Sequence, residues 1–279
     1  MNRLHSLTLS MFLVLCACSA NQSYHSNTDS SDPSIVGGEA VAFSEEIAKS
    51  TVGLAMLGQG VVCTGTLVAP NLVLTAAHCV SGLRPSLLRI VFGLDLESES
   101  LEVRRVLGGR VTERWVALAD DEEFNWGDVA LLRFESSAPA GYQPVRLLGS
   151  MENLKDQADI ELAGYGLTSM APMEDPKKLL KADVKLTNSH YSETEFLVDF
   201  QHGQGVCHGD SGGPIYTKIN DKLFVIGVTS RSETLQGGQT CLEGAVFTSV
   251  PGSIEFLKES AKSLNSKDFV PMEPIPGHP

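Results

Sequence analysis

The chain has 279 residues, enough for one or two compact domains, and its hydrophobic content of 42% is normal for a globular protein. Its formal net charge of −13 argues against a nucleic-acid partner, because binding through the phosphates needs a basic surface. The acidity is read as a solubility feature.

The first 17 residues have the features of an export signal. Arg3 gives a charged start, and residues 7–15 form an apolar core that is short for a membrane span. The segment that ends at Cys18 resembles a bacterial lipoprotein box, in which Cys18 carries the lipid. The alternative is ordinary signal cleavage after Ala20, where small residues have the required spacing. We prefer the lipoprotein interpretation, with residues 1–17 as the signal peptide.

Residues 18–34 form a polar run with one aromatic side chain. Such a segment cannot bury enough surface to offset the entropy of ordering it. We therefore expect a flexible tether or propeptide.

From residue 35 to about residue 250, short apolar runs alternate with turns rich in Gly, Pro, Asn and Asp. Residues 72–74, 88–92 and 224–228 are examples of these runs. Short strands separated by turn residues are typical of an all-β fold.

Only residues 253–264 read as a convincing helix. Ile254, Leu257, Ala261 and Leu264 fall on one face at helical spacing. Residues 265–279 carry four prolines in their last nine positions and predict a loose, Pro-rich tail.

Three segments that lie far apart in the chain supply the groups of a catalytic triad. They are Thr75–Cys79 with His78, Gly127–Leu132 with Asp128, and Gly209–Pro214 with Ser211. A serine hydroxyl becomes a good nucleophile when a base takes its proton and a carboxylate holds that base in one tautomer. The order His, Asp, Ser is one of the known orders for such a triad.

Each triad assignment has an alternative. The segment around Ser211 has the composition of a simple polar turn. Asp120 and Asp121 lie close to Asp128, but Asp128 alone leads directly into the apolar run that follows it. The glycines beside Ser211 favour the catalytic interpretation, since a tight turn can aim the N–H groups of Gly209 and Ser211 at a developing oxyanion.

Several further segments show that the chain resembles the trypsin-like serine proteases of the chymotrypsin fold, over about residues 35–264. The matching positions are Ile35–Gly38, Gly65–Val68, Leu162–Gly166, Ser230 and Gly244–Thr248. The resemblance implies two six-stranded antiparallel β-barrels packed face to face, about residues 35–143 and 144–252, with a C-terminal helix over 253–264. It also implies that the Ser230 hydroxyl supports Asp128.

Four cysteines follow residue 35, and four allow three pairings from sequence alone. The resemblance implies Cys63–Cys79 and Cys207–Cys241. Disulfides indicate an oxidising compartment, so we expect a periplasmic, outer-membrane-anchored or extracellular protein. The chain has no CxxC pair, so the cysteines do not predict zinc, and we expect no metal or cofactor.

The resemblance also implies an activation pair. Cleavage before Ile35 would free an amino group that pairs with Asp210, which would otherwise be a buried carboxylate without a partner. The residue before the cut is Ser34, where this family usually has arginine or lysine. We therefore expect another protease to activate the precursor.

The predicted substrate pocket favours a small or medium aliphatic residue before the cut. Gly205 occupies the position of the aspartate that binds basic side chains in trypsin, so a basic side chain would bury its charge unpaired. The other expected pocket residues are Val206, His208, Ser230, Ser232 and Ala245. Glu233 and Glu243 would reverse the preference if they reached the rim, and Arg231 replaces a usual tryptophan in the adjoining subsite.

The sequence thus predicts a serine endopeptidase that acts on peptide or protein substrates through an acyl-enzyme. It is made as a precursor and held on a membrane through Cys18 until cleavage. The alternative is an uncleaved or inactive surface protein of the same fold that acts by binding a partner.

Overall fold

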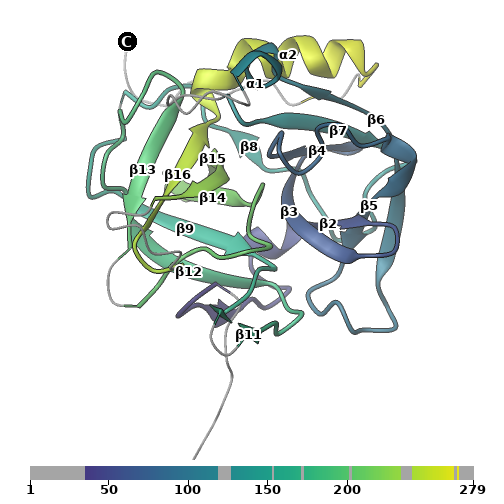
Figure 1. Cartoon of the computed structure of the whole chain (residues 1–279), viewed down its shortest axis with the longest axis horizontal. Coiled ribbons are helices and arrows are strands. Elements are labelled where there is room, and N and C mark those ends of the chain that lie inside the picture. The colour runs from purple at the N-terminus through teal and green to yellow at the C-terminus, as the bar shows by residue number, and fades with distance from the viewer. Residues whose placement is uncertain are drawn as a thin grey trace, which may run out of the picture. The chain divides into compact units, whose positions relative to one another are not determined.

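The computed structural model describes most of the chain from residue 35 onward (Figure 1). The described residues are 35–118, 127–152, 154–170, 173–200, 203–233, 241–266 and 269. The predicted signal peptide, Cys18, the tether and most of the Pro-rich tail lie outside them. Within the described residues, no helix combines the length and the apolar character that a membrane span requires.

The first half of the domain is a closed antiparallel barrel of six strands. Its order around the barrel is β2 (Thr51–Met56), β3 (Gly60–Ala69), β4 (Leu72–Thr75), β7 (Ala130–Phe134), β6 (Glu102–Val111) and β5 (Leu88–Phe92). Fully buried side chains such as Leu54, Leu67 and Leu131 fill the interior. A 3-10 helix, Ile47–Lys49, leads into β2, and two short helices join later strands of the barrel: the 3-10 helix Pro85–Leu87 and α1 (Glu113–Leu118).

The second half is an eight-stranded sheet. Its order is β1 (Glu39–Ala40), β12 (Leu180–Lys185), β9 (Asp159–Gly164), β14 (Pro214–Ile219), β15 (Lys222–Ser232), β16 (Gly244–Ser249) and β13 (Glu195–Asp199), with β8 (Arg146–Leu147) parallel to β15. A small hairpin of β10 (Ser169–Met170) and β11 (Met173–Glu174) stands apart. The hydrophobic core of this second half includes Ile35, Phe196 and Phe247, whose side chains are fully buried.

The C-terminal helix packs against the first half. A 3-10 turn (Pro251–Ser253) leads into α2 (Ile254–Ser263), which lies beside α1 in Figure 1. Leu257 and Ala261 are buried in the core of the first barrel, so the predicted apolar face is the face that packs. Arg110 Nε on β6 donates a hydrogen bond to Ser263 Oγ at 3.0 Å. The predicted all-β fold with a C-terminal helix is confirmed.

One buried tyrosine ties the two halves together. Tyr216 lies on β14, and its hydroxyl is 2.8 Å from Ser50 Oγ and 3.0 Å from Thr51 Oγ1 on the other half. A buried tyrosine hydroxyl normally needs such a partner. These bonds fix the two halves against each other.

Candidate active site

His78 and Asp128 are brought together by strand pairing. His78 follows β4 and Asp128 precedes β7, and the two strands pair with Thr75 opposite Ala130. His78 Nδ1 lies 2.7 Å from Asp128 Oδ2, and the His78 backbone N–H donates to Asp128 Oδ1 at 2.9 Å. With Nδ1–H directed at the carboxylate, Nε2 is left as the basic nitrogen of the ring.

The Asp128 carboxylate is buried and held by both halves of the fold. Its exposed fraction is 1%. Ser230 Oγ, on β15, donates to Asp128 Oδ2 at 2.7 Å, and Thr248 Oγ1 donates to the Asp128 carbonyl at 3.1 Å. A buried carboxylate with this many donors keeps one orientation. The alternatives Asp120 and Asp121 lie outside the described residues.

Ser211 lies next to the same histidine. The Cys79 sulfur is 3.7 Å from His78 Nε2 and also 3.7 Å from the Ser211 carbonyl oxygen, so both residues converge on one atom. Within the described residues, no hydrogen bond joins Ser211 Oγ to His78 Nε2. Such catalytic hydrogen bonds are often long before substrate binds.

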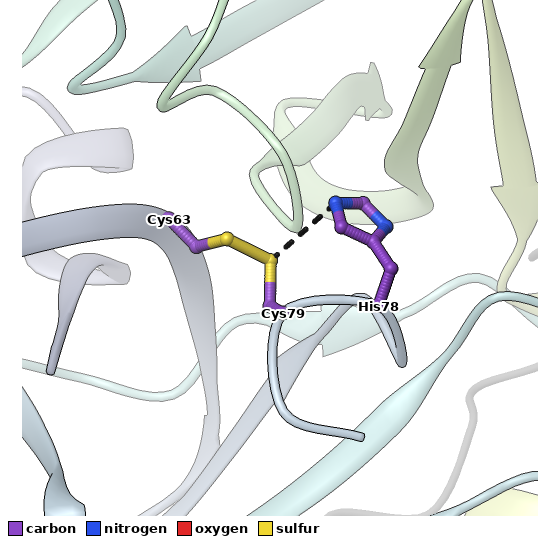
Figure 2. A group of neighbouring side chains, drawn as sticks. All are labelled: Cys63, His78 and Cys79. Carbon is purple, nitrogen blue, oxygen red and sulfur yellow. Dashed lines mark hydrogen bonds between the residues drawn. A yellow bond between two sulfur atoms is a disulfide. The ribbon is translucent and has the colours of Figure 1, made fainter. Parts of the chain in front are cut away.

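Both disulfides implied by the resemblance are formed in the structure, Cys63–Cys79 and Cys207–Cys241. Figure 2 shows the first of them beside the His78 ring. Cys63, His78 and Cys79 place their ligand-type atoms within 4.8 Å of one another, as the residues of a metal site would. Because the two sulfurs are bonded to each other, neither is a thiolate, and this donor set does not suit a metal ion.

Two backbone N–H groups beside Ser211 face away from their neighbours. The His208 carbonyl accepts a hydrogen bond from Leu167 N–H, and the Asp210 carbonyl accepts one from Gly213 N–H, each at 2.8 Å. In a trans peptide the N–H points opposite to the C=O. The N–H groups of Gly209 and Ser211 therefore point away from these partners, and neither donates a hydrogen bond to any residue that the structure describes. Two free donors only two residues apart suit an oxyanion.

Gly209 can be nothing but glycine in this turn. Its φ is 102°, a conformation that residues with a side chain rarely adopt. A Cβ atom at this position would also lie 2.7 Å from the Gly166 Cα. The turn that aims the two N–H groups thus depends on the absence of a side chain.

Asp210, between them, points into the protein interior. Its exposed fraction is 1%, and its carboxylate accepts hydrogen bonds from Gly166 N–H and Cys207 N–H, both at 2.9 Å. Burial raises the pKa of this carboxyl to about 7, although the two N–H donors act in the opposite direction. Cβ atoms at Gly164 or Gly166 would collide with this carboxylate, which explains the glycines of the 162–166 segment.

Ile35 lies in the same half of the fold. Its side chain is fully buried, and the following residue, Val36, exchanges two backbone hydrogen bonds of 3.0 Å with Gly205. The start of the described chain is therefore seated against the segment that leads to Asp210.

Three of the residues expected to form the substrate pocket, Gly205, Val206 and His208, adjoin the Cys207–Cys241 disulfide. A Cβ atom at Gly205 would lie 2.0 Å from the Cys241 carbonyl oxygen, so this position has no room for a side chain. Val206 and Ala245 are buried, whereas His208 is exposed. Ser232 is exposed and pairs with Ala245 between β15 and β16. Residues 234–240 lie outside the described residues, and the Ser230 hydroxyl is turned to Asp128.

Two features of the site are not evident from the sequence. Arg231 forms a bidentate ion pair with the buried Glu195 on β13, with nitrogen–oxygen distances of 2.7 and 3.1 Å. Trp115 on α1 lies over the histidine, with its ring centroid 6.3 Å from that of His78. Nothing in the sequence points to either contact, because β13 carries a carboxylate at each end and Trp115 lies outside the predicted motifs.

Comparison with known proteins agrees with this geometry. The family model described as Trypsin matches residues 35–256. The chain is 26% identical to Hypodermin-B of Hypoderma lineatum over 72% of this chain and 78% of that protein. It is 30% identical to Trypsin of Saccharopolyspora erythraea over 71% of this chain and 87% of that protein. For Trypsin Blo t 3 of Blomia tropicalis the identity is 30%, over 55% of this chain and 62% of that protein. The chain therefore belongs to the trypsin family of serine peptidases.

Proposed function

We propose that the chain is a serine endopeptidase that works through an acyl-enzyme, with Ser211 as nucleophile, His78 as base and Asp128 as the carboxylate that orients it. The observation that carries this proposal is the hydrogen-bonded line from Ser230 through Asp128 to His78, which ends beside Ser211. Its catalytic domain spans about residues 35–264, and it needs no cofactor.

Each group has a defined part in the reaction. Ser211 Oγ attacks the peptide carbonyl while His78 Nε2 takes the hydroxyl proton, and the N–H groups of Gly209 and Ser211 stabilise the negative oxygen. His78 then gives the proton to the departing amine, which leaves an ester on Ser211. Water attacks this ester by the same steps. The Asp128 carboxylate stabilises the imidazolium.

The residues of the expected pocket support an aliphatic substrate preference. Val206 and Ala245 are buried hydrophobic residues, and Gly205 offers no carboxylate to a basic side chain. A lysine or arginine in this pocket would lose its hydration without gaining a partner. We propose that the enzyme cleaves after small or medium aliphatic residues.

A peptide library that varies only the residue before the cut tests this preference. For a chain that begins at Ile35, kcat/KM for valine or alanine is expected to exceed that for lysine by about 100-fold or more, because an unpaired buried charge costs several kcal/mol. Fluorophosphonate labelling of Ser211 in the same sample reports whether the site is active. A preference for lysine or arginine would contradict the proposed pocket and point to Glu233 or Glu243. A folded chain that takes no label would favour the binding-protein alternative.

The proposed activation pair is Ile35 and Asp210. Both side chains are buried, and Asp210 forms no ion pair within the described residues. A new amino group at Ile35 would supply the missing cation. Ser34 before the cut does not fit an enzyme with a trypsin-like or an aliphatic preference, so a second protease is proposed as the activator.

We further propose that the precursor is exported and anchored to a membrane by lipid on Cys18. The two disulfides support an oxidising location outside the cytoplasm. No cysteine lies between residues 19 and 34, so a cut before Ile35 would leave no covalent link between the lipid and the catalytic domain. Activation and release would then be one event.

Fractionation of cells that express the chain checks this release. Uncut protein is expected in the membrane fraction, and fluorophosphonate-labelled protein with Ile35 as its first residue is expected in the soluble fraction. Replacing Cys18 by serine should make both forms soluble, because the acylation site is lost. Labelled enzyme that still carries acylated Cys18 in the same chain would contradict the proposal.

A further inference from the structure

One buried threonine contacts the loop around Ser211 at several points. Thr64 lies on β3 and is fully buried. Its backbone N–H donates to the Ser211 carbonyl at 2.8 Å, and its hydroxyl lies 2.8 Å from the Gly209 carbonyl. The hydroxyl also accepts the Tyr165 N–H at 3.1 Å, and the Thr64 carbonyl accepts the Thr75 hydroxyl at 2.8 Å. Every polar group of this residue is therefore engaged.

The direction of the Thr64 hydroxyl bond is set by its neighbours. A hydroxyl has one proton to donate. The Tyr165 N–H is itself a donor and takes a lone pair of Oγ1, and the Gly209 carbonyl can only accept. The Thr64 proton therefore lies on the bond to the Gly209 carbonyl.

Thr64 fixes two of the peptide planes that adjoin the free N–H groups. The Gly209–Asp210 peptide is held at its oxygen by the Thr64 hydroxyl and at its N–H by the Cys207 carbonyl, at 3.0 Å. The Ser211–Gly212 peptide is held at its oxygen by Thr64 N–H and at its own N–H by a carbonyl of β15, at 2.8 Å. These planes adjoin the peptides that carry the Gly209 and Ser211 N–H groups. Rotation of either plane would swing those donors.

We propose that Thr64 is a positioning residue of the reaction: its hydroxyl, through the Gly209 carbonyl, holds the two oxyanion-binding N–H groups in their productive direction. This inference rests on the proposed function. Gly209 has no Cβ atom to restrict its rotation and sits at φ 102°, so an external bond must hold it. The bond comes from the other half of the fold, which makes the oxyanion site depend on how the two halves are packed.

The test compares variants that differ in the hydroxyl alone. In a chain that begins at Ile35, Thr64→Val keeps the shape but leaves the Gly209 carbonyl and the Tyr165 N–H buried without a partner. We expect kcat to fall about 10- to 100-fold with KM nearly unchanged, less than the full loss of an oxyanion donor. Thr64→Ser keeps the hydroxyl and should retain kcat within about threefold. Thr64→Ala serves as the hydroxyl-free variant if the valine chain does not fold.

A second measurement separates positioning from general stability. A peptidyl trifluoromethyl ketone forms a hemiketal on Ser211: the Oγ–carbon bond forms, the carbonyl electrons move to oxygen, and the hydroxyl proton passes to His78. Its inhibition constant should rise in Thr64→Val by the factor by which kcat/KM falls, because both report on the bound oxyanion. The pH at which the hemiketal oxygen gains a proton should rise as well.

Thr217→Val is the matched control. Thr217 is buried on β14 and its hydroxyl donates to the Asp159 carbonyl at 3.1 Å, so this variant loses a similar bond away from the site. Its kcat should equal that of the parent chain. Wild-type kcat in a folded Thr64→Val chain would overturn the inference, and so would equal losses in Thr64→Ser and Thr64→Val. A folded parent chain that is inactive and binds no ketone would overturn the proposed function, and the inference with it.

Discussion

Replacing Ser211 by alanine is expected to lower kcat about 10⁶-fold in a chain that begins at Ile35, with little change in KM. The variant loses the nucleophile but keeps the pocket and the two free N–H groups, so substrate binding is preserved. Steady-state hydrolysis of a peptide that is cleaved well by the parent chain measures the effect. The remaining rate should stay above that of the uncatalysed reaction, since binding and the N–H groups still act.

The predicted loss has a matched control and an additivity test. Ser137→Ala changes an exposed serine between the halves and should leave kcat unchanged. His78→Ala combined with Ser211→Ala should lower kcat no further than Ser211→Ala alone, because triad residues act as one unit. A loss of only a few-fold on removing Ser211 would mean that another group is the nucleophile.

Cleavage before Ile35 is expected to raise kcat/KM at least about 100-fold. Without the new amino group, Asp210 is a buried carboxylate with no cation beside it, and an unpaired buried charge of this kind costs about 3–5 kcal/mol. The uncut chain should therefore shift toward conformations in which the Asp210 loop is displaced and the Gly209 and Ser211 N–H groups are not aligned. Hydrolysis by a chain that begins at residue 19 is compared with hydrolysis by one that begins at Ile35.

The same comparison predicts that stability depends on pH differently in the cut and uncut chains. Burial raises the Asp210 pKa to about 7 in the folded uncut chain, from an ordinary value of 3.8. Between these pH values the unfolded chain binds fewer protons than the folded chain, so the free energy of unfolding falls as pH rises. The full difference corresponds to about 4 kcal/mol. In the cut chain, the Ile35 amino group would favour the ionised form of Asp210 over the protonated form. The free energy of unfolding would then not fall with pH until the amino group loses its proton, above about pH 8.

Thermal unfolding of Ser211→Ala chains, which cannot digest themselves, provides the measurement. The difference in Tm between the cut and uncut chains should widen from pH 5 to pH 8. Asp210→Asn in the uncut chain should abolish the fall in stability with pH, whereas Asp159→Asn, at an exposed carboxylate, should leave it intact. An uncut chain whose stability does not depend on pH in this range would show that Asp210 is already compensated.

Local sequence patterns predicted part of this fold for clear physical reasons. Short apolar runs between turn residues are typical of strands in a β domain. The helical spacing of Leu257 and Ala261 predicts the helix that packs on the barrel. The division into two halves came instead from a resemblance carried by short motifs. It implied two six-stranded barrels, and the structure has one closed barrel of six strands and a second sheet of eight. Strand order depends on contacts between distant segments, which periodicity does not encode.

The site residues also divide into those that local motifs predict and those that depend on contacts between distant segments. His78, Asp128 and Ser211 sit in motifs whose residue types reveal their chemistry, so they could be predicted. Thr64 and Glu195 could not, because their partners Gly209 and Arg231 lie 145 and 36 residues away in sequence. An isolated threonine or glutamate in a strand gives no sign of which group it will meet. Only the three-dimensional arrangement shows that one holds a turn and the other neutralises an arginine.

The two ends of the described chain are exchanged between the halves. The N-terminal strand β1 pairs with β12 in the second sheet, whereas the C-terminal helix α2 covers the core of the first barrel. Each half is therefore completed by a segment from the opposite end of the chain: Ile35, which precedes β1, is buried in the core of the second half, and Leu257 of α2 is buried in the core of the first. A cut in the connection between the halves should therefore leave the two pieces associated. The arrangement of the halves would then be lost only when the whole domain unfolds.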